Sequence, residues 1–233
     1  MTHASREELR AEMLARIPGW YSPVAHALLP SLAVLAVAAL AVSRIREPTL
    51  PELLLVPAFL AVGNAVEWHA HRGLLHRRTR FLEALYAHHT PQHHALYVPD
   101  AMAIRSVREL RFVLLPAYAV LTVLAASAPA VLGFFAMGEP NLAALWVAAT
   151  AACLLCHEWL HLACHLPESS RLVRLPAIRR LRRHHQLHHA PVLMQRWNFN
   201  VTVPLWDLVR GTVYSPPRPA PAGAGPLPAR RAR

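Results

Sequence analysis

Three histidines lie four residues apart in the second half of the chain, at His157, His161 and His165. On an α-helix, residues at i, i+4 and i+8 lie on nearly one face, so the three imidazoles form a stripe. They close a long apolar run that begins near Asn141, and imidazole is costly to bury in such a segment without a partner. The spacing therefore predicts that these three imidazoles have a binding partner.

The same stretch matches the zinc-protease signature His-Glu-x-x-His at His157, Glu158 and His161. In that signature two histidines bind zinc and the glutamate acts as a general base. Such a site needs only one further ligand, whereas the chain holds 16 histidines. An intramembrane zinc metalloprotease is therefore an alternative hypothesis and not the main one.

The histidines gather in four clusters, within residues 69–76, 88–94, 157–165 and 184–189. Each cluster lies at or shortly after the end of an apolar run, so all four can converge at one membrane surface. Neutral imidazoles bind Zn, Cu, Fe and Ni alike, and therefore the ligand type does not identify the metal. About ten imidazoles are too many for one tetrahedral ion and suit two ions.

Four apolar runs must position these clusters. Hydrophobic residues make up 55% of the chain, more than the roughly 45–50% of ordinary soluble domains. Spanning a bilayer takes about 20 apolar residues, and this length predicts spans at residues 26–43, 50–68, 112–136 and 141–160. Prolines inside the runs predict kinks rather than breaks; they are Pro57, Pro116 and Pro129.

The charge pattern predicts the orientation. All 24 basic residues are arginines, against 13 acidic residues, for a net charge of +11. Because the arginines flank the apolar runs, an anionic membrane surface is a better partner for them than nucleic acid. They concentrate in residues 69–111 and 166–233, which the positive-inside rule places in the cytoplasm with both termini and the histidine clusters. Residues 172–183 alternate arginines with apolar side chains, as an interfacial helix does.

We therefore expect an all-α integral membrane protein with four transmembrane helices and a cytosolic, histidine-rich helical cap. Residues 1–25 are predicted to form an N-terminal amphipathic, interfacial segment. Residues 26–214 form the membrane-embedded histidine-box domain. Residues 215–233, which are rich in proline, alanine and arginine, are predicted to be a disordered tail.

In their order, the clusters resemble the histidine boxes of the fatty acid hydroxylase/sterol desaturase superfamily. The resembling motifs are His71-Arg-Gly-Leu-Leu-His76, the His89/His93-His94 group, His161-x-x-x-His165 and His185-x-x-His188-His189. The pair Glu67-Trp68 before the first box resembles that family's acidic-aromatic pair. Residues 198–212 resemble its closing Trp-Asp…Gly-Thr signature, so the resemblance covers roughly residues 50–214.

The resemblance implies a non-haem di-iron enzyme that uses O2 and two electrons to hydroxylate or desaturate a lipid C–H bond. Two iron ions are the implied cofactor, although zinc can replace iron in purified protein because it binds such sites more tightly. The ligands carried over from the family are His71, His76, His89, His93, His94, His161, His165, His185, His188 and His189.

The second box departs from the family pattern. The usual His-x-x-His-His spacing would place its first histidine at Thr90, and we choose His89 over His88 as the ligand. His157 then falls outside the ligand set, which makes the protease signature an accident of composition.

Other side chains are candidates for supporting the ligands, because ligating imidazoles usually need orienting partners. These candidates are His69, His184, Glu67, Glu158 and Asp207. The chain has only two aspartates, too few for a site dominated by carboxylates.

The sequence shows no haem, flavin or nicotinamide motif, which implies a separate electron-transfer protein that docks on the arginine-rich face. A metal-storing or lipid-binding protein without catalysis is a further alternative. The lipid itself and the position oxidised stay open.

Overall fold

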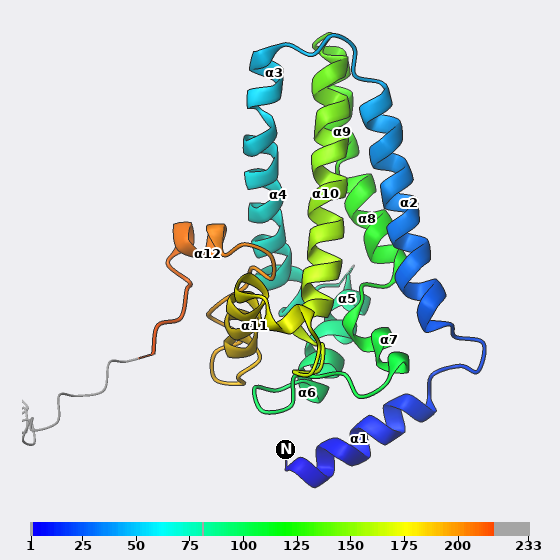
Figure 1. Cartoon of the computed structure of the whole chain (residues 1–233), viewed down its shortest axis with the longest axis vertical. Coiled ribbons are helices and arrows are strands. Elements are labelled where there is room, and N and C mark those ends of the chain that lie inside the picture. Colours follow the sequence, from blue (N-terminus) through cyan, green and yellow to red (C-terminus); the bar gives the residue numbers. More distant parts are fainter. Residues whose placement is uncertain (1, 81, 217–233) are drawn as a thin grey trace, which may run out of the picture.

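The computed structural model describes residues 2–80 and 82–216, and every regular element in that part is a helix. Long helices stand side by side above a cap of short ones (Figure 1). Four helical stretches are long and apolar enough to cross a membrane, at Pro23–Ser43, Leu50–Leu75, Val107–Ala136 and Pro140–Cys164. This confirms the predicted all-α fold with four spans and indicates a multi-pass membrane protein. The side on which the cap lies stays a prediction.

Helix α10 (Pro140–Cys164) is the central span. It packs against α2 (Pro23–Ser43), α4 (Val56–Ala70), α9 (Ala128–Ala136) and the cap helix α11 (Pro176–His188) (Figure 1). Where the spans meet, small and branched apolar residues of three spans form one core cluster, Val34, Val120, Ala151 and Leu154. The side chains on the outer faces are apolar and exposed, as a lipid-facing surface requires.

The prolines interrupt two of the spans. The second span divides at Leu55 into α3 (Leu50–Leu54) and α4, two residues before Pro57. The third consists of η3 (Val107–Glu109), α7 (Leu110–Val113), α8 (Ala117–Ala126) and α9. Leu114 and Pro116 are extended, and proline cannot continue a helix because it lacks the amide hydrogen and its ring clashes with the preceding turn. The prediction of a kink is therefore wrong at Pro116, where the helix breaks.

Short helices build the cap and carry most of the histidines. They are α1 (His3–Ala15), η1 (His71–Leu75), α5 (Glu83–His88), η2 (His89–His93), α6 (His94–Leu96), η4 (Leu172–Arg174), α11 and α12 (Leu205–Arg210). Two of them, η1 and η2, are π-helical turns that coincide with the first two histidine clusters. Turns of this kind are rare and occur frequently at functional sites.

The N-terminal helix α1 is part of the cap. Its apolar face (Leu9, Met13 and Leu14) packs on a buried cluster that includes Leu96, Tyr97 and Phe112. Whether residues 1–25 also contact the membrane interface stays a prediction. The predicted tail, residues 215–233, lies outside the described residues from residue 217 onward.

Candidate metal centre

The ten predicted ligands come together in the cap as two groups of five histidines. Within each group the candidate ligand nitrogens all lie within 4.8 Å of one another, and all ten side chains are buried. The first group contains His71, His76, His89, His94 and His188. The second group contains His93, His161, His165, His185 and His189. His88 lies in neither group, and its Nε2 contacts the Leu114 carbonyl at 3.2 Å.

Ordinary helical spacing builds most of the second group. His161 and His165 are one turn apart at the end of α10, and His185 and His189 are one turn apart at the end of α11. Because α10 and α11 pack together, the two pairs meet, with 3.1 Å between the Nε2 atoms of His165 and His185. His93 completes this group from η2.

The two π turns build most of the first group. The amide of His76 donates to the carbonyl of His71, and that of His94 donates to the carbonyl of His89. A bond from i to i+5 brings residues five apart close together, which the α-helical period does not. The turn in η2 therefore pairs His89 with His94 and leaves His93 for the second group.

Backbone carbonyls fix the orientation of half the candidate ligands. A carbonyl oxygen can only accept a hydrogen bond, so each Nδ1 atom that faces one must carry the hydrogen. The Nε2 atom of the neutral ring is then left with a lone pair. The Nδ1 donors and their acceptors are His71 to Phe199, His93 to Phe112, His165 to Met102, His188 to Trp197 and His189 to Tyr97.

These lone pairs point at one another. The Nε2 atoms of His93 and His189 lie 3.2 Å apart, and neither carries a hydrogen if both rings are neutral. The Nε2 atoms of His71 and His89, and those of His76 and His188, lie 2.9 Å apart, and in each pair the ring held by a carbonyl, His71 or His188, presents a lone pair to its partner. Facing lone pairs repel, and a cation that accepts both removes the repulsion. The donor set of each group therefore fits a metal ion that prefers imidazole.

Protonation does not relieve this repulsion at neutral pH. Burial, reinforced by neighbouring imidazoles, lowers the pKa of His89, His93 and His94 well below the usual value. Burial also lowers the pKa of His76 to about 2 and that of His165 to about 3. These rings are therefore neutral, which is the form that binds metals.

The model of the family described as "Fatty acid hydroxylase" matches residues 56–212, about two thirds of the chain. The chain belongs to the fatty acid hydroxylase family. The match includes all ten clustered histidines and the closing segment through Thr212. Family membership implies an oxidoreductase. Comparisons with curated proteins and with solved structures give no match.

Carboxylates support the histidines of this fatty acid hydroxylase family member through the backbone. Within residues 2–80 and 82–216, none of the candidates Glu67, Glu158 and Asp207 forms a hydrogen bond with any of the ten histidines, so any support that they give is indirect. Asp207 accepts from the amides of Phe199 at 3.0 Å and Asn200 at 2.8 Å. It thereby holds the loop whose carbonyls orient two ligands of the first group.

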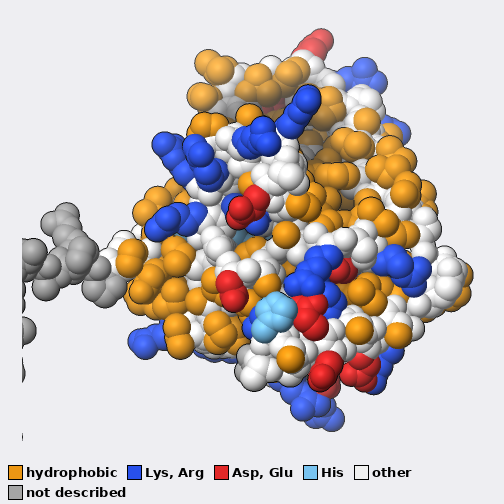
Figure 2. Space-filling model, turned by 60° about the horizontal axis from the view of Figure 1, so that its bottom comes forward, with side chains coloured by type: hydrophobic (Ala, Val, Ile, Leu, Met, Phe, Trp, Pro, Cys, Tyr) orange, Lys and Arg blue, Asp and Glu red, His pale blue; other side chains and the backbone are white. Residues whose placement is uncertain are grey.

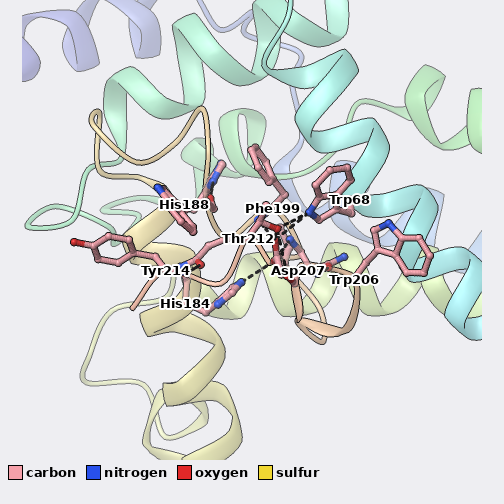
Figure 3. A network of polar contacts seen from close by, with 12 residues as sticks. Trp68, His184, His188, Phe199, Trp206, Asp207, Thr212 and Tyr214 are labelled. Atoms are coloured by element: carbon pink, nitrogen blue, oxygen red, sulfur yellow. Dashed lines mark hydrogen bonds and ion pairs between the residues drawn. The ribbon is translucent and has the colours of Figure 1, made fainter. Parts of the chain in front are cut away.

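Side chains also converge on Asp207. Figure 3 shows Trp68, His184 and Thr212 around its carboxylate, which accepts from Trp68 Nε1 at 3.1 Å, His184 Nε2 at 3.0 Å and Thr212 Oγ1 at 2.6 Å. Burial acts to raise the pKa of Asp207, but hydrogen bonds from His184, Thr212 and the loop amides outweigh it and lower the pKa. The carboxylate is therefore ionised. The predicted supporting role of His184 runs through this carboxylate, whereas His69 is exposed and packs edge-on against Trp68.

The protease signature is not supported. His157 Nδ1 lies 3.2 Å from Glu67 Oε1, and His157 belongs to neither group of five. Both oxygens of Glu158 lie 3.2 Å from the amide nitrogen of Leu115, which they bind at the break in the third span. The glutamate that would act as base therefore has a structural role.

One supporting network was not predicted. Tyr97 packs its ring against His93 and His165, and its hydroxyl donates to Glu109 at 3.0 Å. Glu109 forms a buried ion pair with Arg10 of α1. No sequence spacing connects residues 99 positions apart, so only the folded chain reveals this network.

Proposed function

We propose that the chain binds two metal ions, one in each group of five histidines, and that iron fills both sites in the active enzyme. The observation that carries this proposal is the two sets of facing, neutral Nε2 atoms. Bound iron would supply the activation of O2 and the oxidation of a C–H bond. The substrate is a membrane lipid, which the enzyme either hydroxylates or desaturates.

The protein's own contribution is to hold two sites next to each other and away from water. His93 and His94 are adjacent in the chain and belong to different groups, with 5.6 Å between their ring centroids. The rings of His94 and His189 stack across the two groups at 4.2 Å. This arrangement favours a paired centre over two independent sites.

A small cavity lies where both groups meet the helix bundle. Its volume is about 10 Å³, and its walls include His71 and His89 of the first group and His93 and His161 of the second. This is the side from which a lipid in the apolar bundle can approach the histidines. A lipid chain is larger than this space, so side chains must move to admit it.

A separate electron-transfer protein and the cytoplasmic placement of the site complete the proposal. Arginines are spread over the cap with acidic side chains between them, and little histidine surface shows on the face in Figure 2. Exposed arginines of η4, α11 and their surroundings suit an acidic donor: Arg171, Arg174, Arg179, Arg180 and Arg183. Such steering should weaken with salt, because exposed charges are screened beyond about 8 Å at physiological ionic strength. The excess of arginines in the cap supports the cytoplasmic side.

The test is a reaction with iron-loaded protein, a reductase chain, total lipid extract and isotopically labelled O2. We expect a lipid that has gained one oxygen atom carrying the label, or a lipid that has lost two hydrogens if the reaction is desaturation. The variant His188→Ala, which lacks one ligand of the first group, should give neither product. Metal binding without lipid oxidation would favour a storage protein, and cleavage of a peptide would favour the protease.

A further inference from the structure

His157 and Glu67 form a polar pair inside the bundle, directly before the histidine centre. Glu67 is one turn before His71 on α4, and His157 is one turn before His161 on α10. The pair therefore links one helix that leads into the first group with one that leads into the second. Both side chains are largely buried, at 10% and 17% exposure. A buried polar pair needs a reason, because apolar residues pack a bundle at lower cost.

The contacts of Glu67 determine which nitrogen of His157 is free. Glu67 Oε1 accepts from the amides of Val201 at 2.8 Å and Thr202 at 3.0 Å. Its Oε2 accepts from Thr202 Oγ1 at 2.6 Å and from the side-chain amides of Asn200 and Asn64. All these neighbours donate, so Glu67 acts purely as an acceptor and His157 Nδ1 must donate to it. The one side-chain hydrogen bond of His157 within the described residues is made through Nδ1, which leaves Nε2 without a partner there.

His157 also lines the cavity between the two groups of histidines. Because Nδ1 is bound to Glu67, Nε2 is the nitrogen of His157 that can bind a group in this cavity. At about 10 Å³ the cavity is close to the volume that one water-sized group needs. Several of its other walls are apolar (Leu75, Leu85, Phe112, Val113 and Val201), and Nε2 of His88 is bound to a carbonyl.

We propose that His157, oriented by Glu67, is a substrate-binding residue whose Nε2 forms a hydrogen bond with an oxygen atom of the lipid. The substrate is then a lipid with a hydroxyl group close to the carbon that is oxidised, because the Nε2 lone pair can accept a hydrogen bond from a hydroxyl. Four residues of α-helix rise about 6 Å, so a lipid oxygen at His157 lies only a few bonds from a carbon at His161. This inference rests on the proposed lipid oxidation and narrows its substrate class.

The test measures binding in zinc-loaded protein, because zinc has no redox chemistry and the lipid stays unchanged. The probes are hexadecanol and hexadecane in detergent micelles, and bound probe is quantified after the protein is re-isolated. One net hydrogen bond of about 1–1.5 kcal/mol corresponds to roughly tenfold tighter binding. We therefore expect the wild-type protein to prefer the alcohol by about tenfold.

Two substitutions separate binding by Nε2 from a structural role of the pair. In His157→Asn the amide keeps a donor for Glu67 but nothing replaces Nε2, so the preference for the alcohol should disappear. In His157→Gln the longer side chain places an amide near the position of Nε2, so part of the preference should return. His69→Asn is the matched control, since His69 is exposed and lies outside the cavity, and it should keep the full preference.

Zinc content is measured in parallel and should stay the same in all three variants. The inference is overturned if wild-type protein does not distinguish the two probes, if His157→Asn keeps the preference, or if His157→Asn loses zinc. The last result would show that the pair serves only to build the metal centre. A preference for the alcohol in a protein that oxidises no lipid would contradict the proposed function and leave the binding site standing.

Discussion

Replacing Asp207 by asparagine should weaken one metal site and spare the other. Asp207 Oδ1 accepts from Trp68, Phe199 and Thr212, and Oδ2 accepts from Asn200 and His184. In asparagine an NH2 group replaces one of the two oxygens. That NH2 group donates hydrogen bonds, and at either position it faces groups that also donate. At least one buried amide of the loop then loses its acceptor, at a cost of about 1–3 kcal/mol.

The consequence is specific because of what that loop holds. The carbonyls of Phe199 and Trp197 accept from His71 and His188, both of the first group. Three rings of the second group are oriented by the carbonyls of Phe112, Met102 and Tyr97, away from Asp207. Loss of an orienting partner typically lowers metal affinity by about 10- to 100-fold. We expect that loss in the first site and an unchanged second site.

The assay is a chelator titration of zinc-loaded protein, with metal content measured at each step. Wild-type protein should release its two ions over similar chelator concentrations, whereas Asp207→Asn should release one ion at about 10- to 100-fold less chelator. Equal weakening of both ions, or no weakening, would refute the division of supporting contacts between the two groups.

Three further predictions follow from the same contacts. Glu109→Ala should weaken the second site in the same titration and spare the first, because it leaves Arg10 buried without its counter-ion and removes the acceptor of the Tyr97 hydroxyl; the carbonyl of Tyr97 orients His189. In a background without the native cysteines, Met137→Cys should react with an impermeant thiol reagent outside intact cells and Arg78→Cys should not; the reverse pattern would overturn the orientation. The metal-free protein should lose thermal stability as the pH falls below about 6.5. Burial lowers the pKa of His76 to about 2 in the folded state, whereas its pKa in the unfolded state is about 6.5. The contribution of His76 to the free energy of unfolding is therefore full above pH of about 6.5 and decreases as the pH falls from there toward about 2. An unchanged melting temperature between pH values of about 7 and 4 would contradict this.

Residue types and their periodicity were sufficient to predict the spans and the four histidine clusters, whereas the choice of ten ligands within the clusters came from the family resemblance. The apolar runs report on burial in a bilayer, and imidazoles at such depth need partners, so both signals are present in the chain itself. The pairing of the histidines was not predictable, because it depends on π turns. Counting along an α-helix relates His89 to His93, whereas the π turn pairs it with His94.

Contacts between residues that are distant in the sequence could not be predicted from the sequence pattern either. Glu67 and Asp207 were candidates for supporting the ligands, but the sequence did not show how: both bind the amides of a loop, and carbonyls of that loop orient two of the histidines. At the break before Pro116, Glu158 accepts the hydrogen bond of the Leu115 amide, which the interrupted helix leaves free. Only tertiary structure shows that such a partner is in place.

The metal-to-protein ratio of the purified chain, measured together with its X-ray absorption spectrum, tests the central claim most directly. We predict two ions per chain, each with light-atom ligands at about 2.0–2.1 Å if zinc is bound. His93→Ala should lose an ion from the second group, and His188→Ala should lose one from the first. A single ion that survives both substitutions and is lost in His157→Ala would contradict the two-site account.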